Sequence, residues 1–489
     1  MAKRKRQETS NGEKPAEVLL TKKAKAAAET MVSTEDGPIT IQIIAGSYDK
    51  ILHGVTATIP KGGGKADFAD TFLFMPHTSP IKSLALSPPS DQGPGVPQKV
   101  MLASGGVDER INVYNLSAHP PVVKKQDTVL SSLAPRPIKE NMRNREIGTL
   151  LHHSAAITAL AFPTRSKLLS ASEDSTIAVA RTRDWNLLSV IKAPKPKAFG
   201  RASGDTQTSD TTPYGVNDFA IHPSMKLMVS VSRGERCMRL WNLVTGKKAG
   251  VLNFSRDLLQ EIGERKHSTG EGQQTVWGNT EAGEEFAVMF NKDVVVFGMD
   301  SIPRCKVMPD TRVSVHGAKY VTLNEETGEA VMAVATGDGR IMFFSTSEDD
   351  LTEPEEGKGT LPKAKQVAQL GGRAVECTTR IKDFTIMEAN EDEGKVMFIT
   401  TGSSDGSIRV WRTSHAELRS AAKDEKQPKQ IAELLGTYNT ENRITCLESF
   451  IMIPLPEGVE ESEDEDLEDM YSSKDDDDKG SDDSTDEEE

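Results

Sequence analysis

A short phrase that recurs along most of this 489-residue chain restricts its fold more than any other feature. It reads L-L-S-A-S-E-D-S-T-I-A-V-A at Leu168–Ala180 and I-T-T-G-S-S-D-G-S-I-R-V-W at Ile399–Trp411. Related phrases occupy Leu102–Tyr114, Val229–Trp241 and Val334–Phe344. Each phrase predicts an apolar strand, a tight turn that usually carries an acidic residue, and an alternating strand that in most copies ends on an aromatic residue. Repetition of one such unit indicates a repeat architecture made of β-strands.

Seven short apolar strands open the successive units. They are Ile81–Leu86, Ile157–Phe162, Val216–Ile221, Thr275–Trp277, Val313–Val315, Ile381–Ile386 and Ile444–Phe450. Most units exceed the ~40–45 residues of a propeller blade. The excess lies in inserts rich in Pro, Gly, Ser, Lys and Glu, which we expect to be surface loops: Pro88–Pro97, Pro120–Arg145, Lys195–Pro213, Arg256–Gln274, Ser347–Lys365 and Ser414–Lys429.

The two ends of the repeat region complement each other. Three strands, at Ile41–Gly46, Lys50–Ala57 and Phe72–Met75, come before the first opening strand, whereas Ile444–Phe450 opens a unit that does not continue. Joining them completes one four-stranded blade from both ends and removes the exposed strand edges. The sequence therefore predicts an all-β fold, a seven-bladed β-propeller over residues 39–456.

The charge of the chain is divided unevenly along its length. The formal net charge is −15, but residues 457–489 alone hold 19 Asp and Glu against two Lys, a net −17. Residues 1–30 hold eight Lys and Arg against four Glu. Segments with this composition cannot bury enough apolar surface to fold. We therefore expect a disordered basic head at 1–38 and a disordered acidic tail at 457–489, a pattern typical of proteins that work with nucleic acid or nucleoprotein.

Little in the sequence points to catalysis, metals or membranes. The four cysteines lie far apart, so we expect four buried thiols in a reducing compartment. A G-x-S-x-G match at Gly402–Gly406 falls inside a strand–turn–strand phrase, whereas a hydrolase needs a strand–turn–helix elbow at that motif. No apolar run approaches the ~20 residues of a membrane span. We expect no enzyme activity, no cofactor and no small-molecule substrate.

The turn phrase resembles the WD repeat. That resemblance implies a hydrogen-bonded set in each blade: a His before the opening strand, a Ser or Thr on the second strand, an Asp in the tight turn and a Trp on the third strand. This chain departs from the pattern at Ala180, which replaces the aromatic residue, and at Cys377, which stands where His is expected. The matching positions are His77, Asp108, Tyr114, His153, Asp174, Glu235, Trp241, Asp338, Phe344, Asp405 and Trp411.

A narrower resemblance covers about residues 39–454. The phrases A-G-S-Y-D-K-I-L-H-G at Ala45–Gly54 and N-R-I-T-C-L at Asn442–Leu447 are similar to one subfamily of WD-repeat ribosome-assembly factors. It includes the fungal maintenance-of-killer protein and the animal p21-activated-kinase-interacting protein. The resemblance implies a nucleolar role in assembly of the large ribosomal subunit and, for the animal branch, a negative effect on p21-activated kinase. The tail here is acidic, whereas the animal tail is lysine-rich.

These observations give two functional hypotheses. The first is a non-enzymatic nucleolar scaffold that docks on large-subunit precursors, with rRNA, ribosomal proteins and assembly factors as partners and with no membrane contact or self-association. The alternative is an adaptor that restrains a p21-activated kinase. Two basic clusters suit nuclear import: Lys3, Arg4, Lys5, Arg6, Lys22, Lys23 and Lys25. Basic residues of two inserts suit contact with rRNA phosphates: Lys124, Lys125, Arg143, Arg145, Lys195, Lys197 and Arg201.

Overall fold

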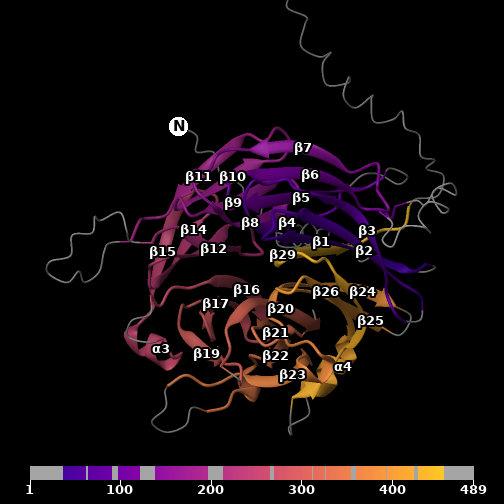
Figure 1. Ribbon diagram of the computed structural model, residues 1–489. Helices are drawn as coiled ribbons and strands as arrows, with labels where there is room; N and C mark the ends of the chain where they lie inside the picture. The colour runs from indigo at the N-terminus through magenta and orange to yellow at the C-terminus, as the bar shows by residue number, and fades with distance from the viewer. Residues whose placement is uncertain are drawn as a thin grey trace, which may run out of the picture.

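Seven β-sheets stand around a common axis as the blades of a propeller (Figure 1). The structure is a computed structural model that describes residues 37–61, 64–90, 97–121, 138–196, 213–264, 269–310, 312–324, 327–353, 360–391, 394–422 and 428–455. Six sheets have four strands and one has five. The predicted fold class, a seven-bladed β-propeller, is confirmed. The head and tail predicted at 1–38 and 457–489 lie almost wholly outside the described residues, and their boundaries remain predictions.

We number the blades from β4. Blade 1 contains β4 (Ile81–Leu86), β5 (Lys99–Gly106), β6 (Ile111–Ser117) and β7 (Arg145–Leu150); blade 2 contains β8 (Ile157–Thr164), β9 (Lys167–Ser172), β10 (Thr176–Arg181) and β11 (Leu187–Lys192); blade 3 contains β12 (Val216–Ile221), β13 (Leu227–Ser232), β14 (Cys237–Asn242) and β15 (Lys247–Asn253). Blade 4 contains β16 (Gln274–Thr280), β17 (Gly283–Met289), β18 (Val294–Gly298) and β19 (Pro303–Val307); blade 5 contains β20 (Val315–Asn324), β21 (Glu329–Thr336), β22 (Arg340–Ser345), β23 (Lys365–Gly371) and the short β27 (Lys429–Gln430); blade 6 contains β24 (Ile381–Glu391), β25 (Gly394–Ser403), β26 (Ser407–Ser414) and β28 (Glu433–Asn439). The closing blade contains β29 (Ile444–Ile451), β1 (Ile39–Ser47), β2 (Leu52–Ile59) and β3 (Asp67–Phe74).

Within each blade the four main strands are antiparallel, and the first strand lies nearest the axis. The tight turns between second and third strands therefore share one side of the ring with the loops that lead into each first strand. We call this side the turn face. In five of these turns the residue after the acidic one is left-handed, with φ of 69° at Lys50, 66° at Glu109, 67° at Ser175, 83° at Gly339 and 90° at Gly406. Glycine adopts this conformation without strain, which explains its place in two of the phrases.

The closing blade joins the two ends of the folded region, as predicted. Strand β29 pairs with β1 in antiparallel register, which sets Glu448 opposite Ile44 and Leu447 opposite Ala45. Figure 1 shows the yellow strand β29 lying beside the indigo strand β1. The ring is thus closed by hydrogen bonds between segments at opposite ends of the sequence, and β1 and β29 present no unpaired edge to each other.

The structure also differs from the expected elements in several places. Strand β3 spans Asp67–Phe74, so the strand predicted at Phe72–Met75 was placed too late, and β2 spans Leu52–Ile59, two residues later than the predicted Lys50–Ala57. Strand β20 begins at Val315 and runs for ten residues, so the opening strand predicted at Val313–Val315 was placed too early and too short. Two inserts contain helices, α3 (Arg256–Glu261) and α4 (His415–Ala422). In each helix apolar side chains are buried against neighbouring blades, Leu258 and Leu259 in α3 and Leu418 and Ala421 in α4. Tertiary packing thus made helices of segments whose composition predicted loops.

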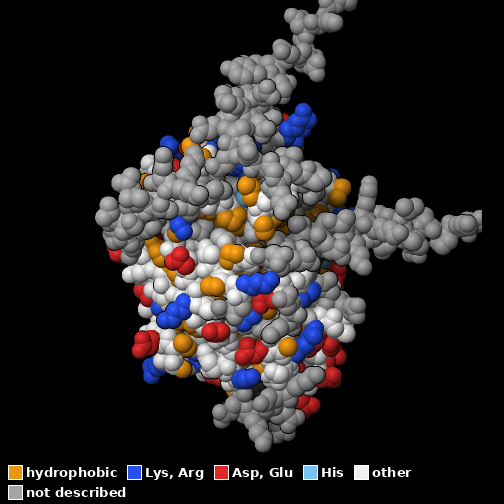
Figure 2. Space-filling model, turned by 90° about the vertical axis from the view of Figure 1, so that its right-hand side faces the viewer, with side chains coloured by type: hydrophobic (Ala, Val, Ile, Leu, Met, Phe, Trp, Pro, Cys, Tyr) orange, Lys and Arg blue, Asp and Glu red, His pale blue; other side chains and the backbone are white. Residues whose placement is uncertain are grey.

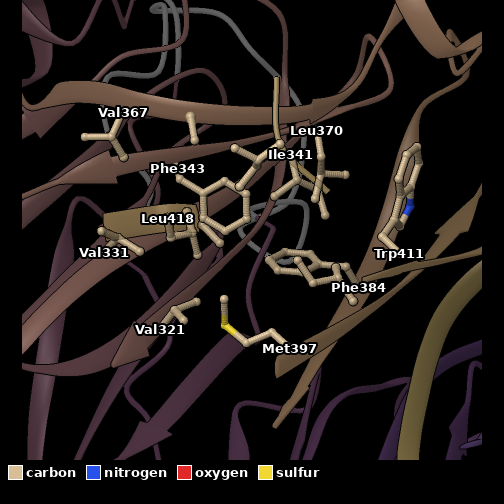
Figure 3. Close-up of a cluster of buried hydrophobic side chains, with 14 of the residues drawn as sticks. Val321, Val331, Ile341, Phe343, Val367, Leu370, Phe384, Met397, Trp411 and Leu418 are labelled. Atoms are coloured by element: carbon tan, nitrogen blue, oxygen red, sulfur yellow. The ribbon is translucent and has the colours of Figure 1, made fainter. Parts of the chain in front are cut away.

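The core lies between adjacent blades. Figure 3 shows the layer between blades 5 and 6, where Phe343, Phe384 and Leu418 meet from three different elements. The indole of Trp411 is 1% exposed in the same layer. All four thiols are buried and unpaired, as the cysteine spacing predicted: Cys237, Cys305, Cys377 and Cys446.

Candidate functional site

The hydrogen-bonded set expected from the repeats forms fully in blade 1. The ring of His77 is buried, with Nδ1 2.9 Å from Oδ1 of Asp108 and Nε2 2.9 Å from the hydroxyl of Ser104. Asp108 also accepts the backbone N–H of Thr78 at 2.9 Å. These bonds hold the pKa of Asp108 below its usual value despite partial burial, which acts in the opposite direction. Tyr114 completes the set through Ser104, and burial raises the pKa of its phenol.

Blade 2 fills the place of its missing aromatic residue with a second histidine. His153 Nδ1 lies 3.0 Å from Asp174, and its Nε2 lies 2.8 Å from the hydroxyl of Ser170. His152 Nε2 lies 2.9 Å from the same hydroxyl, and the two imidazole rings are 4.5 Å apart. Burial and then the neighbouring His153 lower the pKa of His152 to about 4. Both histidines therefore belong to the structural network of this blade.

Blades 3, 5 and 6 lack the histidine, and other side chains bind the turn acid. Glu235 pairs with Arg239 on β14, with Nη2 2.7 Å from Oε1. Asp338 accepts Arg340 Nη2 at 2.7 Å. Asp405 accepts the hydroxyl of Thr379 at 2.9 Å, two residues after the buried Cys377. Each turn acid thus keeps a hydrogen-bond partner, as partly buried polar groups require.

The third-strand aromatic residues follow a rule that the strand register reveals. Trp241 donates its indole N–H to Ser230 at 2.8 Å, and Trp411 donates to Thr401 at 3.3 Å. Phe344 and Phe297 occupy the equivalent positions of blades 5 and 4, where the register sets Val334 and Val288 in place of the hydroxyl residue. The second-strand residue therefore carries a hydroxyl only where the aromatic ring, or a histidine in its place, needs a partner.

The first strands of all seven blades line a central cavity of about 470 Å³. Side chains near the start of these strands bond to the next blade around the ring. The links are Thr445 Oγ1 to Ile81 O at 2.6 Å, Thr158 Oγ1 to Val216 O at 2.7 Å, Asn217 Nδ2 to Gly272 O at 2.8 Å, Ala318 N to Gln274 Oε1 at 3.0 Å and Leu447 N to Asp383 Oδ2 at 3.0 Å. These bonds tie neighbouring blades together around the cavity, so its shape is largely fixed by the fold.

His316 and Lys382 line one sector of this cavity on the turn face, and two arginines just before β24 and β29 lie near Lys382. We call His316, Arg380, Lys382 and Arg443 the basic mouth. Lys382 has a lowered pKa, chiefly because it is partly buried and then because Arg380 and Arg443 lie close to it. Burial and then Lys382 and Arg380 lower the pKa of His316 to about 4, so its ring is neutral at pH 7. Sequence inspection missed this cluster, whose members come from three blades.

Three buried carboxyl groups belong to the first strands that form the channel. Burial raises the pKa of Asp218 to about 7, although it accepts the Thr275 N–H at 3.0 Å. Burial also raises the pKa of Asp383, and that of Glu448 to about 7, while Lys319 acts in the opposite direction on both. Asp218 and Asp383 line the same recess as Lys382, so the channel holds both cationic and carboxyl groups.

The predicted rRNA-contact residues do not gather on one surface. Arg145 is the first residue of β7, the outer strand of blade 1, and Arg143 lies two residues before it. Lys195 lies just after the end of β11, the outer strand of blade 2. Since outer strands run the same way in every blade, these residues lie on opposite faces of the ring. Lys195 stands over the ring of Tyr214 at 4.2 Å. The remaining members of this set lie outside the described residues, as do the predicted import clusters: Lys124, Lys125, Lys197, Arg201, Lys3, Arg4, Lys5, Arg6, Lys22, Lys23 and Lys25.

The G-x-S-x-G match has no elbow geometry. Ser404 lies in the turn between strands β25 and β26, and its N–H donates to Arg380 O at 2.9 Å. In the described part of the chain no three His, Cys, Asp or Glu residues are grouped to hold a metal ion. No helix among the described residues is long and apolar enough to cross a membrane.

A second surface feature lies on the side of the ring. Leu73, Phe74 and Met75 at the end of β3 are 52%, 38% and 66% exposed, and Ile138, which is 59% exposed, forms an isolated bridge with Asp70 of the same strand. Figure 2 shows apolar side chains gathered in the upper half of its view and charges of both signs in the lower half. Nothing among the described residues covers this apolar patch.

Seven blades closed through both chain ends, with turn acids hydrogen-bonded across the strands, define a seven-bladed WD-repeat β-propeller. The WD domain, G-beta repeat model matches residues 144–179 and 393–412, which cover the phrases with Asp174 and Asp405.

The resemblance seen in the sequence is confirmed by similar proteins from animals and yeast. The chain is 23% identical over 423 residues to the p21-activated protein kinase-interacting protein 1-like of Xenopus laevis, covering 86% of this chain and 84% of the relative. It is 24% identical over 408 residues to the Gallus gallus protein of that name, covering 83% and 79%. It is 27% identical over 434 residues to protein MAK11 of Saccharomyces cerevisiae, covering 83% and 82%. WD-repeat propellers of this kind are typically non-enzymatic scaffolds for protein interactions.

Proposed function

We propose that this protein is a non-enzymatic nucleolar scaffold for assembly of the large (60S) ribosomal subunit. The observation that carries the proposal is the similarity to MAK11 along nearly the whole propeller, because the subfamily resemblance implies that role. The basic mouth supports it: a rigid ring with a cationic recess suits docking on a particle made of RNA and protein.

Depletion of the protein followed by sucrose-gradient sedimentation and rRNA hybridisation tests this role. We expect fewer free large subunits and an accumulation of large-subunit rRNA precursors. Re-expression of the wild-type chain restores the profile, and so does Lys167→Glu, a control on an exposed residue at the opposite face. Arg380→Glu/Lys382→Glu should restore it poorly if the basic mouth contributes. A normal gradient and normal precursors after depletion would refute the proposal.

A second candidate function is regulation of a p21-activated kinase. The observation that favours it is the name shared by the three animal relatives. Purified protein should then bind the kinase and lower its autophosphorylation. Absence of binding at micromolar concentration eliminates this candidate without affecting the ribosomal one.

A further inference from the structure

The basic mouth differs from the rest of the channel rim in how its charges are balanced. Elsewhere on the rim, Glu173 accepts Lys82 Nζ at 2.7 Å and lies 3.3 Å from Arg233 Nη1, so these cations are paired. Within the described ranges no ion pair joins the side chains of Arg380, Lys382 or Arg443 to a carboxylate; Asp49 accepts the backbone N–H of Arg443 at 3.1 Å. Three neighbouring cations around one recess repel each other, and an anion placed there relieves that repulsion.

The geometry of the mouth admits acidic side chains of an extended peptide. The guanidinium of Arg443 lies 5.5 Å from the ring of Tyr48, which is 55% exposed on the same rim. Lys382 and His316 line the cavity itself. Arg380 lies in the loop that leads into β24, the strand that contains Lys382. A recess of about 470 Å³ has room for single carboxylate side chains.

The chain itself contains a segment with the matching charge. Residues 457–489 carry 19 Asp and Glu against two Lys. They follow β29, whose early residues Thr445 and Cys446 line the cavity. Strand β29 rises about 26 Å at ~3.3 Å per residue. The 34 residues from 456 onward span up to roughly 110 Å when extended, so they can return to the turn face.

We propose that the acidic segment 457–489 docks on the basic mouth of its own chain and covers it. Tethering favours this occupant over a free peptide, because a linked segment acts at an effective concentration near the millimolar range. The docked segment competes with other polyanions for Arg380, Lys382 and Arg443. This contact does not depend on the ribosomal role, so the two can fail separately.

Zero-length carbodiimide crosslinking of the full chain tests the contact, because it joins a lysine only to a carboxylate in direct contact. We expect Lys382 to crosslink to carboxylates of 457–489 at least about fivefold more than the exposed Lys167 on the opposite face, since the field of the mouth concentrates the segment there. The crosslink should disappear in about 0.5 M salt, where the Debye length is roughly 4 Å. A mixture of isotopically light and heavy chains should give only light–light and heavy–heavy pairs.

Equal crosslinking of Lys382 and Lys167 would overturn the proposal, and mixed light–heavy pairs would assign the mouth to a second copy instead. The variant Arg380→Glu/Arg443→Glu keeps the reporting lysine and should lower its crosslinking at least about fivefold. An unchanged yield in this variant also overturns the proposal. Thermal unfolding checks that the variant is folded, and the salt series on the wild-type chain provides the same test without any substitution.

Discussion

The pairing of a hydroxyl residue with a third-strand indole can be tested by a double-mutant cycle in blade 6. Thr401 is 0% exposed and Trp411 is 1% exposed, and the indole N–H donates to the threonine hydroxyl at 3.3 Å. Thr401→Val leaves a buried N–H without an acceptor, which should cost about 1–3 kcal/mol. Trp411→Phe removes part of the ring and should cost roughly 1–2 kcal/mol for the cavity that remains.

The double variant recreates the pair that blade 5 already uses, Val334 with Phe344. No buried donor is then left unpaired, so its loss of stability should be smaller than the sum of the single losses by about 1–2 kcal/mol. Urea unfolding followed by far-ultraviolet circular dichroism measures each free energy without relying on tryptophan fluorescence.

A matched control combines Trp411→Phe with Thr56→Val. Thr56 is buried in the closing blade, where its hydroxyl donates to Ala69 O. These two changes share no partner and should add within about 0.3–0.5 kcal/mol. The same additivity in the Thr401 cycle would refute the view that aromatic and hydroxyl residues are coupled in these blades.

Four further predictions concern blade 6, Asp218 and the two charged ends. Trp411→Ala should destabilise the protein by about 3–5 kcal/mol and Asp405→Ala by about 1–3 kcal/mol in urea unfolding; equal and negligible losses would contradict the bonded set. Burial raises the pKa of Asp218 to about 7, so its contribution to stability is fully present below about pH 4 and is lost as the pH rises through 7. The melting temperature of Asp218→Asn relative to wild type should therefore increase between pH 4.5 and 8. A constant difference in melting temperature would contradict this. Deleting residues 1–30 should move the protein from nucleus to cytoplasm in fluorescence microscopy, and unchanged localisation would contradict the import role. Deleting residues 457–489 should raise the RNA affinity near 50 mM salt, where the Debye length is roughly 14 Å, and unchanged affinity would contradict competition by the tail.

The repeat phrases predicted the blades well because strand formation in them depends on local pattern. Strands β4 and β12 have the bounds expected from their apolar runs, and the closing blade followed from counting strands at both ends. Strand β20 was misplaced because polar residues interrupt its pattern: His316, Lys319 and Tyr320 face the channel or a neighbouring blade. Helices α3 and α4 form because their apolar side chains pack on the hydrophobic layers between blades. A local sequence pattern does not show which segment will pack there.

The candidate site was less accessible to sequence reasoning than the fold. Thr379, Arg239 and Arg340 bind the turn acids of blades 6, 3 and 5, yet each is an ordinary surface-type residue in the sequence. Arg380 and Arg443 stand more than 60 positions apart and meet only because blade 6 and the closing blade are neighbours. One usable signal was present: both arginines lie immediately or almost immediately before the first strand of their blade, where side chains surround the axis.

The closing blade can form only late in the biosynthesis of this protein. Ser47 and Ile444 are register partners about 400 positions apart, and a ribosome needs roughly 20–80 s to make that length of chain. Throughout this interval the edge of β1 that pairs with β29 has no such partner. Completion of the ring therefore waits until β29 has been made, and a chain that stops before Ile444 keeps an open β edge available to other strands. Chaperone attachment to nascent chains should accordingly persist until the last strand emerges.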